Sequence, residues 1–288
     1  MKMAEEKTAI AGSTGYLGKY LVKQLIDSGH AGVALARSPE KLEGFESENL
    51  EIRKAEVTRP ETLKGILQGV DTLISTVGIT RQKDGLTYMD VDYQANMNLL
   101  NEAREAGVRK FIYVSVLNGQ NMRELQICEA KERFVDALKS SGMEFTIIRP
   151  TGFFSDMKDF LEMAKRGRVY LFGSGKNQLN PVHGADLAKL CLDAIHLDDA
   201  EIEVGGPEVL SQNDIAKLAL QAWEKPIKIT HLPDGIRRFL LWVARTFLPN
   251  KSRGPIEFFM TAMAISMVAP KYGNHHLADF FKESVSKS

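Results

Sequence analysis

Three features of this 288-residue chain predict an α/β fold built on a doubly wound parallel sheet. Short, almost continuously apolar runs alternate with segments of helical periodicity through the first half of the chain. Strands that are apolar on both faces are typical of parallel sheets covered by helices on both sides. The first apolar run also ends in a glycine-rich turn that leads directly into a helical segment, as expected for a strand followed by a crossover helix.

The elements of the first half follow from these patterns in chain order. Apolar, β-favouring composition predicts strands at 8–11, 32–36, 50–57, 71–77, 110–114 and 144–148. Helical patterns predict helices at 16–28, about 88–106, and 124–140. The first of these carries Leu17, Leu21 and Leu25 at a spacing of four, which gives it one apolar face.

After residue 155 the alternation loosens, and we expect helices at 155–166 and 184–196 and strands at 201–204 and 226–231. Ser211, followed by Asp214, matches the pattern that caps a helix N-terminus. Residues 234–270 are expected to form two amphipathic helices, 236–248 and 256–269, around a loop at 249–255.

The turn after the first strand has the spacing Gly-x-x-Gly-x-x-Gly. Gly12 permits the tight turn, Gly15 lets the backbone approach a pyrophosphate, and Gly18 lets the helix pack closely. Unpaired amides and the helix dipole at a helix N-terminus favour phosphate. We therefore assign the turn to cofactor binding through Gly12, Thr14, Gly15, Tyr16, Leu17 and Gly18. A purely structural turn is the alternative.

The end of the second strand predicts which dinucleotide is bound. Proteins that prefer NAD usually place an acid here, which accepts the ribose 2′-hydroxyl. This chain has Arg37 and Ser38 instead, with Lys41 nearby. A guanidinium can hold a 2′-phosphate through two parallel hydrogen bonds, so we expect NADP (NADPH). A solvated surface arginine is the alternative.

Two further strand ends are assigned to the cofactor. Glu56 and Val57 suit a loop at the edge of the adenine, and Thr76, Val77 and Gly78 suit a backbone that passes beneath the ribose. Ordinary strand-end chemistry is the alternative for both. We therefore expect a dinucleotide-binding core over residues 1–155, with a smaller C-terminal substrate-side region over 156–288 and further core elements around 181–204.

Composition excludes several function classes. Lysine plus arginine and aspartate plus glutamate both number 37, so nothing indicates a nucleic-acid partner. The chain has only two cysteines, which is too few for a disulfide framework, so a reducing compartment is expected. The six histidines lack acidic or cysteine partners at metal spacing, so no metal is expected. With a charged N-terminus and apolar stretches too short to span a bilayer, the chain is expected to be cytoplasmic.

From Thr8 to about residue 205 the chain resembles the short-chain dehydrogenase/reductase superfamily, in its extended and atypical (NmrA-like) branches. The resemblance rests on the glycine turn and on the motifs Tyr113-Val114-Ser115, Arg149-Pro150-Thr151-Gly152-Phe153-Phe154, Pro181-Val182-His183 and Asp186-Leu187-Ala188. Residues 124–192 are most similar to divinyl chlorophyllide reductases. The resemblance implies a Rossmann fold, a nicotinamide cofactor and oxidoreductase activity.

The resemblance breaks at the proton donor. Most members carry Tyr-x-x-x-Lys, but this chain has Ile127 at the tyrosine position and keeps Lys131. One interpretation is a reductase of an apolar small molecule, at a C=C bond or an activated carbonyl, with Lys131 and Ser115 as catalytic residues. Lys131 would also bind the cofactor, at the nicotinamide ribose. The other is an NADP-binding redox sensor or assembly factor without turnover. Replacement donors considered are Tyr88, Tyr93 and Cys128.

Two segments beyond the core complete these expectations. Pro150, Thr151 and Phe153 are assigned to the nicotinamide side, whereas Phe154 fits a core position better. The apolar residues of 236–269 form a lid or packed core, a dimer contact, or a membrane-surface patch. We expect a small-molecule substrate and weigh a homodimer, and we do not expect membrane contact.

Overall fold

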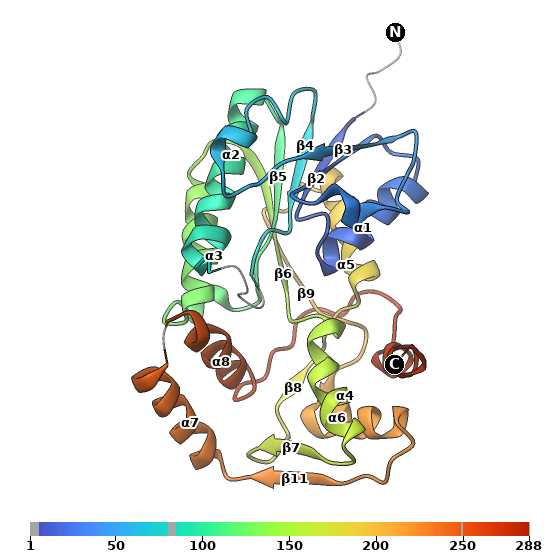
Figure 1. The fold of residues 1–288 in the computed structure, drawn as a ribbon, viewed down its shortest axis with the longest axis vertical. Helices are drawn as coiled ribbons and strands as arrows, with labels where there is room; N and C mark the ends of the chain where they lie inside the picture. The colour runs from blue at the N-terminus through green and yellow to red at the C-terminus, as the bar shows by residue number, and fades with distance from the viewer. Residues whose placement is uncertain (1–5, 80–84, 249, 288) are drawn as a thin grey trace. The chain divides into compact units, whose positions relative to one another are not determined.

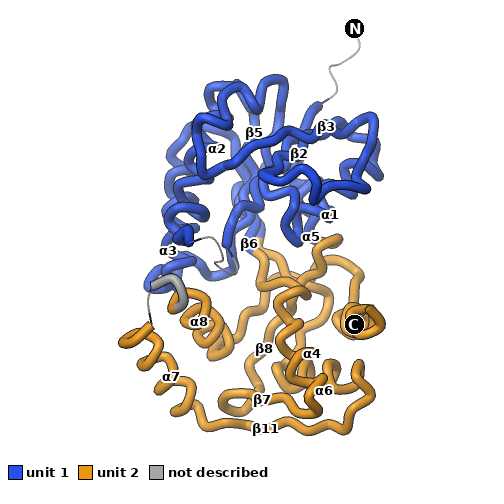
Figure 2. The backbone as a smooth tube through the Cα atoms, in the orientation of Figure 1, with its two compact units in different colours: residues 1–149, 187–202 blue, residues 150–186, 203–288 orange. Residues whose placement is uncertain are grey.

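The computed structural model describes residues 6–79, 85–248 and 250–287. These divide into two compact units, residues 1–149 with 187–202 (unit 1) and residues 150–186 with 203–288 (unit 2), shown in Figures 1 and 2. The sequence placed the division after residue 155. In the structure the chain leaves unit 1 after Arg149 and returns to it for Leu187–Ile202.

Unit 1 contains the predicted parallel sheet. Its strands are β1 (Thr8–Ala11), β2 (Gly32–Ala36), β3 (Leu50–Lys54), β4 (Thr72–Ser75), β5 (Lys110–Val114), β6 (Glu144–Pro150) and β9 (Glu201–Val204). Their order is β3-β2-β1-β4-β5-β6-β9, and β1 pairs in parallel with both β2 and β4. The strand order reverses between β1 and β4, the point outside which doubly wound sheets bind their ligands. The predicted fold class is confirmed.

Helices cover both faces of this sheet. They are α1 (Tyr16–Asp27), the π-helix η3 (Met89–Ala95), α2 (Asn96–Ala106), α3 (Gln126–Lys139) and α5 (Gly184–Asp193). In Figure 1, α2 and α3 lie on one side of the strands and α1 and α5 on the other. Leu99, Phe134 and Leu138 pack on Phe111 and Tyr113 of β5 and form the main core. The sequence predicted one continuous helix over 88–106, but its first part is π-helical.

Three strand boundaries of unit 1 differ from the prediction, and in unit 2 the strand expected at 226–231 lies at Ile229–Leu232. β3 ends at Lys54 and not at Val57, because the amide of Glu56 donates to the Thr62 hydroxyl (3.0 Å) and leaves the ladder. β4 is also shorter than 71–77. β6 continues past Ile148 to Pro150, where the pairing with β9 persists: the next amide, of Thr151, donates to the Val204 carbonyl (3.0 Å).

Unit 2 is built from short elements. Its helices are η5 (Phe154–Met157), α4 (Lys158–Lys165), α6 (Gln212–Ala222), α7 (Asp234–Phe247), α8 (Asn250–Ala262) and α9 (Leu277–Ser286). Its strands are β7 (Val169–Phe172), β8 (Gln178–Leu179), β10 (Leu210–Ser211) and β11 (Ile229–Leu232), paired β7 with β11 and β8 with β10. The predicted cap of α6 is confirmed, since the Ser211 hydroxyl accepts from the Asp214 amide at 3.1 Å.

The second C-terminal helix was predicted at the wrong place. It was expected at 256–269 after a loop at 249–255, but α8 begins at Asn250 and ends at Ala262; Pro249 lies outside the described residues. The chain after α8 turns instead and then runs beside β8, where the amide of Met267 donates to the Gln178 carbonyl (2.8 Å).

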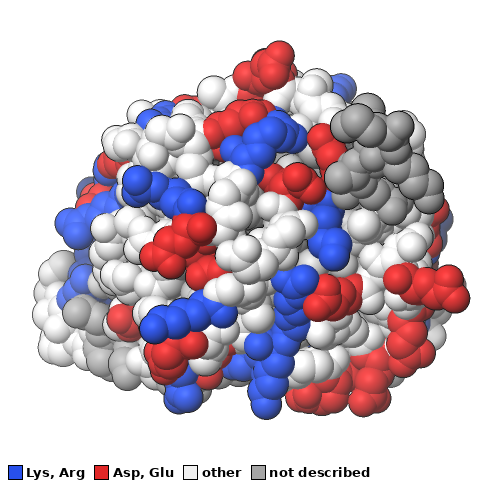
Figure 3. Space-filling view, turned by 90° about the horizontal axis from the view of Figure 1, so that it is seen from above, with Lys and Arg blue, Asp and Glu red and all other residues white. Residues whose placement is uncertain are grey.

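Acidic and basic side chains are interspersed on the face shown in Figure 3. Among the described residues drawn there, neither sign of charge forms a continuous field. This agrees with the formal net charge of zero.

Candidate functional site

The turn between β1 and α1 requires glycine at two of its three glycine positions. Gly12 has φ +82°, and a Cβ there would lie 2.6 Å from the Thr76 Oγ1. A Cβ on Gly18 would lie 2.1 Å from the carbonyl oxygen of Gly12. Side chains at these positions would force the helix away from the strand ends, so the sequence fixes a close approach of α1 to the sheet.

The same turn provides a cradle that fits a pyrophosphate. Gly15 is the N-cap of α1, is exposed, and has no side chain that could cap the helix. First-turn amides of a helix lack intrahelical partners and, together with the helix dipole, bind phosphate. The Ser13 hydroxyl donates to the Leu35 carbonyl (2.7 Å) and holds the turn against β2. Thr14 is half-buried, whereas the Leu17 side chain is buried, so only the Leu17 backbone can face a ligand.

The predicted 2′-phosphate residues follow β2. Arg37 and Lys41 are exposed and Ser38 is half-buried. The Lys41 amide donates to the Ser38 carbonyl (3.1 Å), so a tight turn joins these residues. The turn leaves two cationic side chains at the carboxyl end of β2, on the same sheet edge as the glycine turn.

The remaining predicted cofactor residues of unit 1 lie at neighbouring strand ends. The half-buried Glu56 carboxylate contacts Arg59 (3.4 Å), and the Val57 carbonyl accepts from the Asn98 amide (3.0 Å). The Thr76 hydroxyl donates to the Ala11 carbonyl (3.2 Å), which joins the ends of β4 and β1. Val77 is buried. Their contact with a cofactor stays a prediction.

Lys131 of α3 forms a buried ion pair just beyond the end of β4. Its Nζ lies 3.0 Å from Oδ1 of Asp92, which is 0% exposed, and the other Asp92 oxygen accepts from the Ile79 amide (3.1 Å). A Cβ on Gly78 would lie 2.7 Å from this carboxylate and 3.0 Å from the ammonium. The predicted Lys131 and Gly78 are therefore brought together, around an aspartate that sequence reasoning missed.

The surroundings of this ion pair shift the pKa values of both Lys131 and Asp92. Burial disfavours the ammonium of Lys131, but Tyr113 and Asp92 outweigh it and raise the pKa of Lys131 above its usual value. Burial also raises the pKa of Asp92, an effect opposed by Lys131 and by the Ile79 amide. Because the pKa of Lys131 is raised, Lys131 is an ammonium at neutral pH.

Two buried phenols complete the cluster around Lys131. Tyr88 is 2% exposed and Tyr113 is 0% exposed. The Tyr88 hydroxyl has no hydrogen-bond partner among the described residues, and the Tyr113 hydroxyl interacts with the Lys131 ammonium. Burial raises the pKa of each to about 12. The Lys131 ammonium lies 5.5 Å from the centre of the Tyr113 ring. Sequence reasoning singled out Tyr88 as a replacement phenol and named Tyr113 only within a family motif, and no local pattern marks Asp92.

Two other candidate residues are enclosed by the protein. The Ser115 hydroxyl donates to Glu132 (3.2 Å), whose carboxylate is held by the Arg149 guanidinium at 2.6 and 3.0 Å. Cys128 is 0% exposed, and burial raises the pKa of its thiol to about 12. Ser115 thus takes part in a buried network, and its predicted catalytic role stays a prediction.

The predicted residues after β6 belong to unit 2. Pro150 ends β6, and the Thr151 hydroxyl donates to the Asn180 carbonyl (2.7 Å). Phe153 is half-buried, whereas Phe154 is 2% exposed within the unit 2 core, as the sequence suggested. The nicotinamide contacts assigned to Pro150, Thr151 and Phe153 stay predictions.

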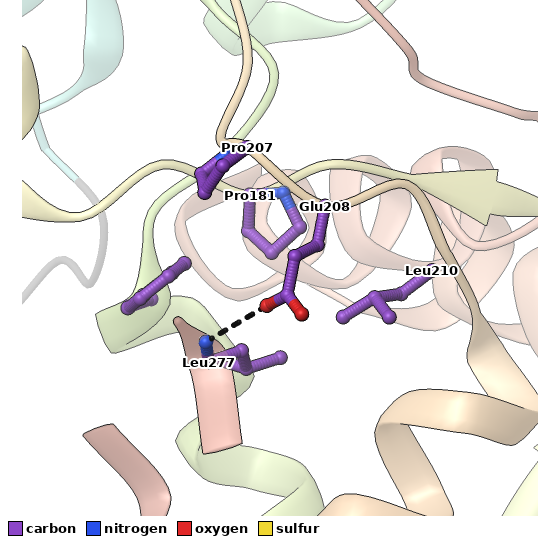
Figure 4. A pocket seen from close by; sticks show the side chains of 6 residues that line it. Pro181, Pro207, Glu208, Leu210 and Leu277 are labelled. Carbon is purple, nitrogen blue, oxygen red and sulfur yellow. Dashed lines mark hydrogen bonds between the residues drawn. The ribbon is translucent and has the colours of Figure 1, made fainter. Parts of the chain in front are cut away.

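Figure 4 shows a hollow within unit 2 that is too small for a substrate site. Its empty volume is about 140 Å³, below the roughly 300–1,000 Å³ of ligand pockets. Glu208 points into it and accepts from the Leu277 amide at 3.4 Å. Its lining residues are Phe154, Pro181, Pro207, Glu208, Leu210 and Leu277. The hollow is a packing feature at the start of α9.

The strand order, the glycine turn and the buried lysine together define a dinucleotide-binding protein of the Rossmann type. Comparison with known proteins agrees: a family described as NAD(P)H-binding matches residues 12–198. The chain belongs to this NAD(P)H-binding family, which confirms both the predicted resemblance and the predicted cofactor class.

Two curated relatives are identical to this chain at about a quarter of the aligned residues. The chain is 25% identical to the photosystem II assembly factor Ycf39 of Synechocystis sp., over 84% of this chain and 75% of that protein. It is 26% identical to the chloroplastic divinyl chlorophyllide a 8-vinyl-reductase of Cucumis sativus, over 96% of this chain and 76% of that protein.

Solved structures show the same fold at lower identity. The Escherichia coli NADPH-dependent quinone oxidoreductase QOR2, complexed with NADPH, matches with a TM-score of 0.73 and 18% identity, over 97% of this chain and 99% of that one. A Staphylococcus aureus nucleoside-diphosphate-sugar epimerase matches with a TM-score of 0.77 and 17% identity, over 96% and 99%.

Proposed function

We propose that this chain is an NADPH-dependent reductase of an apolar small molecule, acting on a C=C bond or an activated carbonyl without the usual catalytic tyrosine. The observation that carries the proposal is the cluster of Lys131, Asp92, Tyr88 and Tyr113. Buried charges and unpartnered hydroxyls destabilise a fold. A cluster that lowers stability at the ligand-binding edge of such a sheet is typical of a catalytic site.

The residues of unit 1 fit the cofactor. The cradle at Gly15 would hold the pyrophosphate, and Arg37, with Ser38 and Lys41, would hold a 2′-phosphate, which favours NADPH over NADH. When bound, the nicotinamide supplies a hydride. The chain's own task is then to position the substrate and to deliver one proton to it.

Lys131 is the best candidate for the residue that supplies the proton to the substrate. Its ammonium stays protonated at neutral pH. Because a raised pKa makes the ammonium a weak acid, orienting a water molecule that delivers the proton suits Lys131 better than direct donation. Asp92 fixes the position of this ammonium through an ion pair of 3.0 Å. The phenol of Tyr88 is a second donor, supplied by an element other than α3. Burial raises the pKa of the Cys128 thiol to about 12, which makes it a weak proton donor.

The alternative is an NADP-binding sensor or assembly factor without turnover. Ile127 occupies the position at which related enzymes carry their phenol, and an isoleucine side chain cannot transfer a proton. The similarity to Ycf39, an assembly factor by name, supports the same alternative. In this case Lys131 would only hold the cofactor.

Turnover of NADPH separates the two functions. The full chain is incubated with NADPH and a panel of conjugated enones, quinones and porphyrin-type pigment precursors, and the loss of nicotinamide absorbance is followed. We expect consumption with at least one compound, and a decrease in kcat of at least about a hundredfold in Lys131→Met, the scale of a lost general acid.

Lys139→Met is the matched control, because Lys139 lies on the same helix with a side chain that is 42% exposed. Its kcat should equal that of the unmodified chain. Saturable NADPH binding without consumption across the whole panel would instead establish the non-catalytic function. Tyr88→Phe, measured in the same assay, distinguishes the phenol from Lys131 as the donor.

A further inference from the structure

We propose that the outer face of α7 is a peripheral binding surface for an anionic lipid bilayer. This face consists of Ile236, Phe239, Leu240, Trp242 and Phe247, each of which is exposed. The exposed fractions are 60% for Phe239, 56% for Trp242 and 69% for Phe247. Single exposed apolar residues are common, but a contiguous cluster of aromatic rings on one helix marks a binding surface.

The exposed stripe is additional to the face by which α7 packs on its own unit. Leu241 and Ala244 form the inner face and are buried. Ile236, Phe239, Leu240 and Phe247 recur at helical spacing and form a second, outer apolar face. An outer stripe of this width has no role in packing unit 2, so we infer that it serves a partner.

The aromatic rings of the outer face are already arranged as one platform. The rings of Phe239 and Trp242 stack with centres 5.9 Å apart and planes at 29°. Phe247 meets Trp242 edge-on, with centres 6.0 Å apart. Because these rings restrict one another's conformations, less conformational entropy is lost when they insert into the surface of a bilayer.

Charge selects the partner. Arg238 is exposed, and Arg245 is 53% exposed although it pairs with Glu257, which is only 7% exposed. Arg253 holds the second oxygen of the same buried carboxylate. The Arg238 and Arg245 side chains are therefore exposed while the acidic partner of Arg245 is buried, so one flank of the stripe is cationic. An isologous pair of chains would bring like charges together, whereas anionic headgroups would complement them.

The dimensions suit a helix lying in the plane of the bilayer surface. α7 has 14 residues, and among the described residues no helix is long and apolar enough to cross a membrane. An amphipathic helix with Trp and Phe on one face and arginines beside it is typical of interfacial binding. The sequence left a membrane-surface patch as one of three roles for these residues and did not favour it. The exposure of the α7 rings and the neighbouring arginines now support that role.

The test uses Trp242 as its own reporter. The chain contains two tryptophans, and Trp223 is half-buried with its indole N–H donated to the Leu161 carbonyl (3.1 Å). Trp223→Phe leaves Trp242 as the sole emitter, and this variant is compared with the parent by circular dichroism. We expect a blue shift, and quenching by brominated lipid, with vesicles of phosphatidylcholine and phosphatidylglycerol but not with phosphatidylcholine alone.

Two surface variants of the reporter chain test the two parts of the argument. Phe239→Ser should weaken vesicle binding by at least about tenfold, from the loss of one buried ring. Arg238→Glu should weaken it by about fivefold or more for each unit of charge changed. Tyr170→Ser is the control, since Tyr170 is 50% exposed but lies on β7, and its binding should be unchanged.

Three outcomes would overturn the proposal. The emission of Trp242 could be unaffected by anionic vesicles, or it could shift equally with neutral ones. Alternatively, light scattering could show a dimer that Phe239→Ser dissociates, which would assign the face to a second copy of the chain. Because no nicotinamide or substrate is used, failure here is independent of the proposed reductase function.

Discussion

Replacing Lys131 by methionine should make the stability of this protein depend strongly on pH. Asp92 is 0% exposed, and besides Lys131 its carboxylate accepts only the Ile79 amide among the described residues. Removing one partner of a buried ion pair costs about 3–5 kcal/mol. The folded variant can avoid most of that loss only if Asp92 takes up a proton.

The sign of the pH dependence follows from the two states. Burial already raises the pKa of Asp92, and without Lys131 nothing of comparable size opposes that effect. The folded variant then binds a proton that the unfolded chain, with an aspartate pKa of about 3.9, releases. Its stability is therefore complete below about pH 4 and decreases by about 1.4 kcal/mol per pH unit up to the folded pKa.

Urea unfolding followed by circular dichroism, between about pH 5 and pH 8, measures this slope. The double variant Asp92→Asn, Lys131→Met removes the titrating group and should not show the additional slope. The reasoning is refuted if Lys131→Met follows the pH dependence of the unmodified chain, or if the double variant keeps the slope of the single one.

Three further predictions test other parts of the structure. Arg37→Ala should weaken NADPH binding by roughly 1–3 kcal/mol and leave NADH binding unchanged in calorimetric titrations, whereas equal losses would discard the 2′-phosphate assignment. Gly18→Ala should lower both the melting temperature and the NADPH affinity, because its Cβ would meet the Gly12 carbonyl at 2.1 Å; Gly235→Ala, with open space around it, is the control. Burial and the stacked His275 lower the pKa of His183 to about 4. The contribution of this neutral ring to the free energy of unfolding is therefore complete above about pH 6.5 and is lost as the pH falls toward 4. His183→Gln should reduce that acid sensitivity in thermal melts, and an unchanged profile would contradict the assignment.

The parts of the fold that depend on local pattern could be predicted from the sequence. β1, β2 and β5 have the predicted bounds, because buried parallel strands are short and apolar throughout. The turn at Gly12 and Gly18 was predictable for a similar reason, since few sequences satisfy such close backbone contacts. Ser211 and Asp214 gave the start of α6 through a cap within one turn.

The parts that depend on distant partners could not be predicted. Asp92 becomes part of the site only because the π-helix η3 packs on α3 and brings it to Lys131. Ser115 takes part in a network with Glu132 and with Arg149, which comes from β6, a distant part of the sequence. The two-residue strands β8 and β10 carry too few residues for any periodicity. Periodicity showed that α7 is amphipathic, but not which of its two apolar faces would be covered.

The cofactor cradle is tested most directly by one binding measurement. The purified full chain is titrated with NADPH at low ionic strength, and nicotinamide fluorescence is recorded together with the heat of binding. Saturation at one equivalent, with weaker binding of NADH, is the predicted result. Absence of saturable binding would contradict the assignment of residues 12–18 and Arg37 to a phosphate-holding edge, and with it the proposed function.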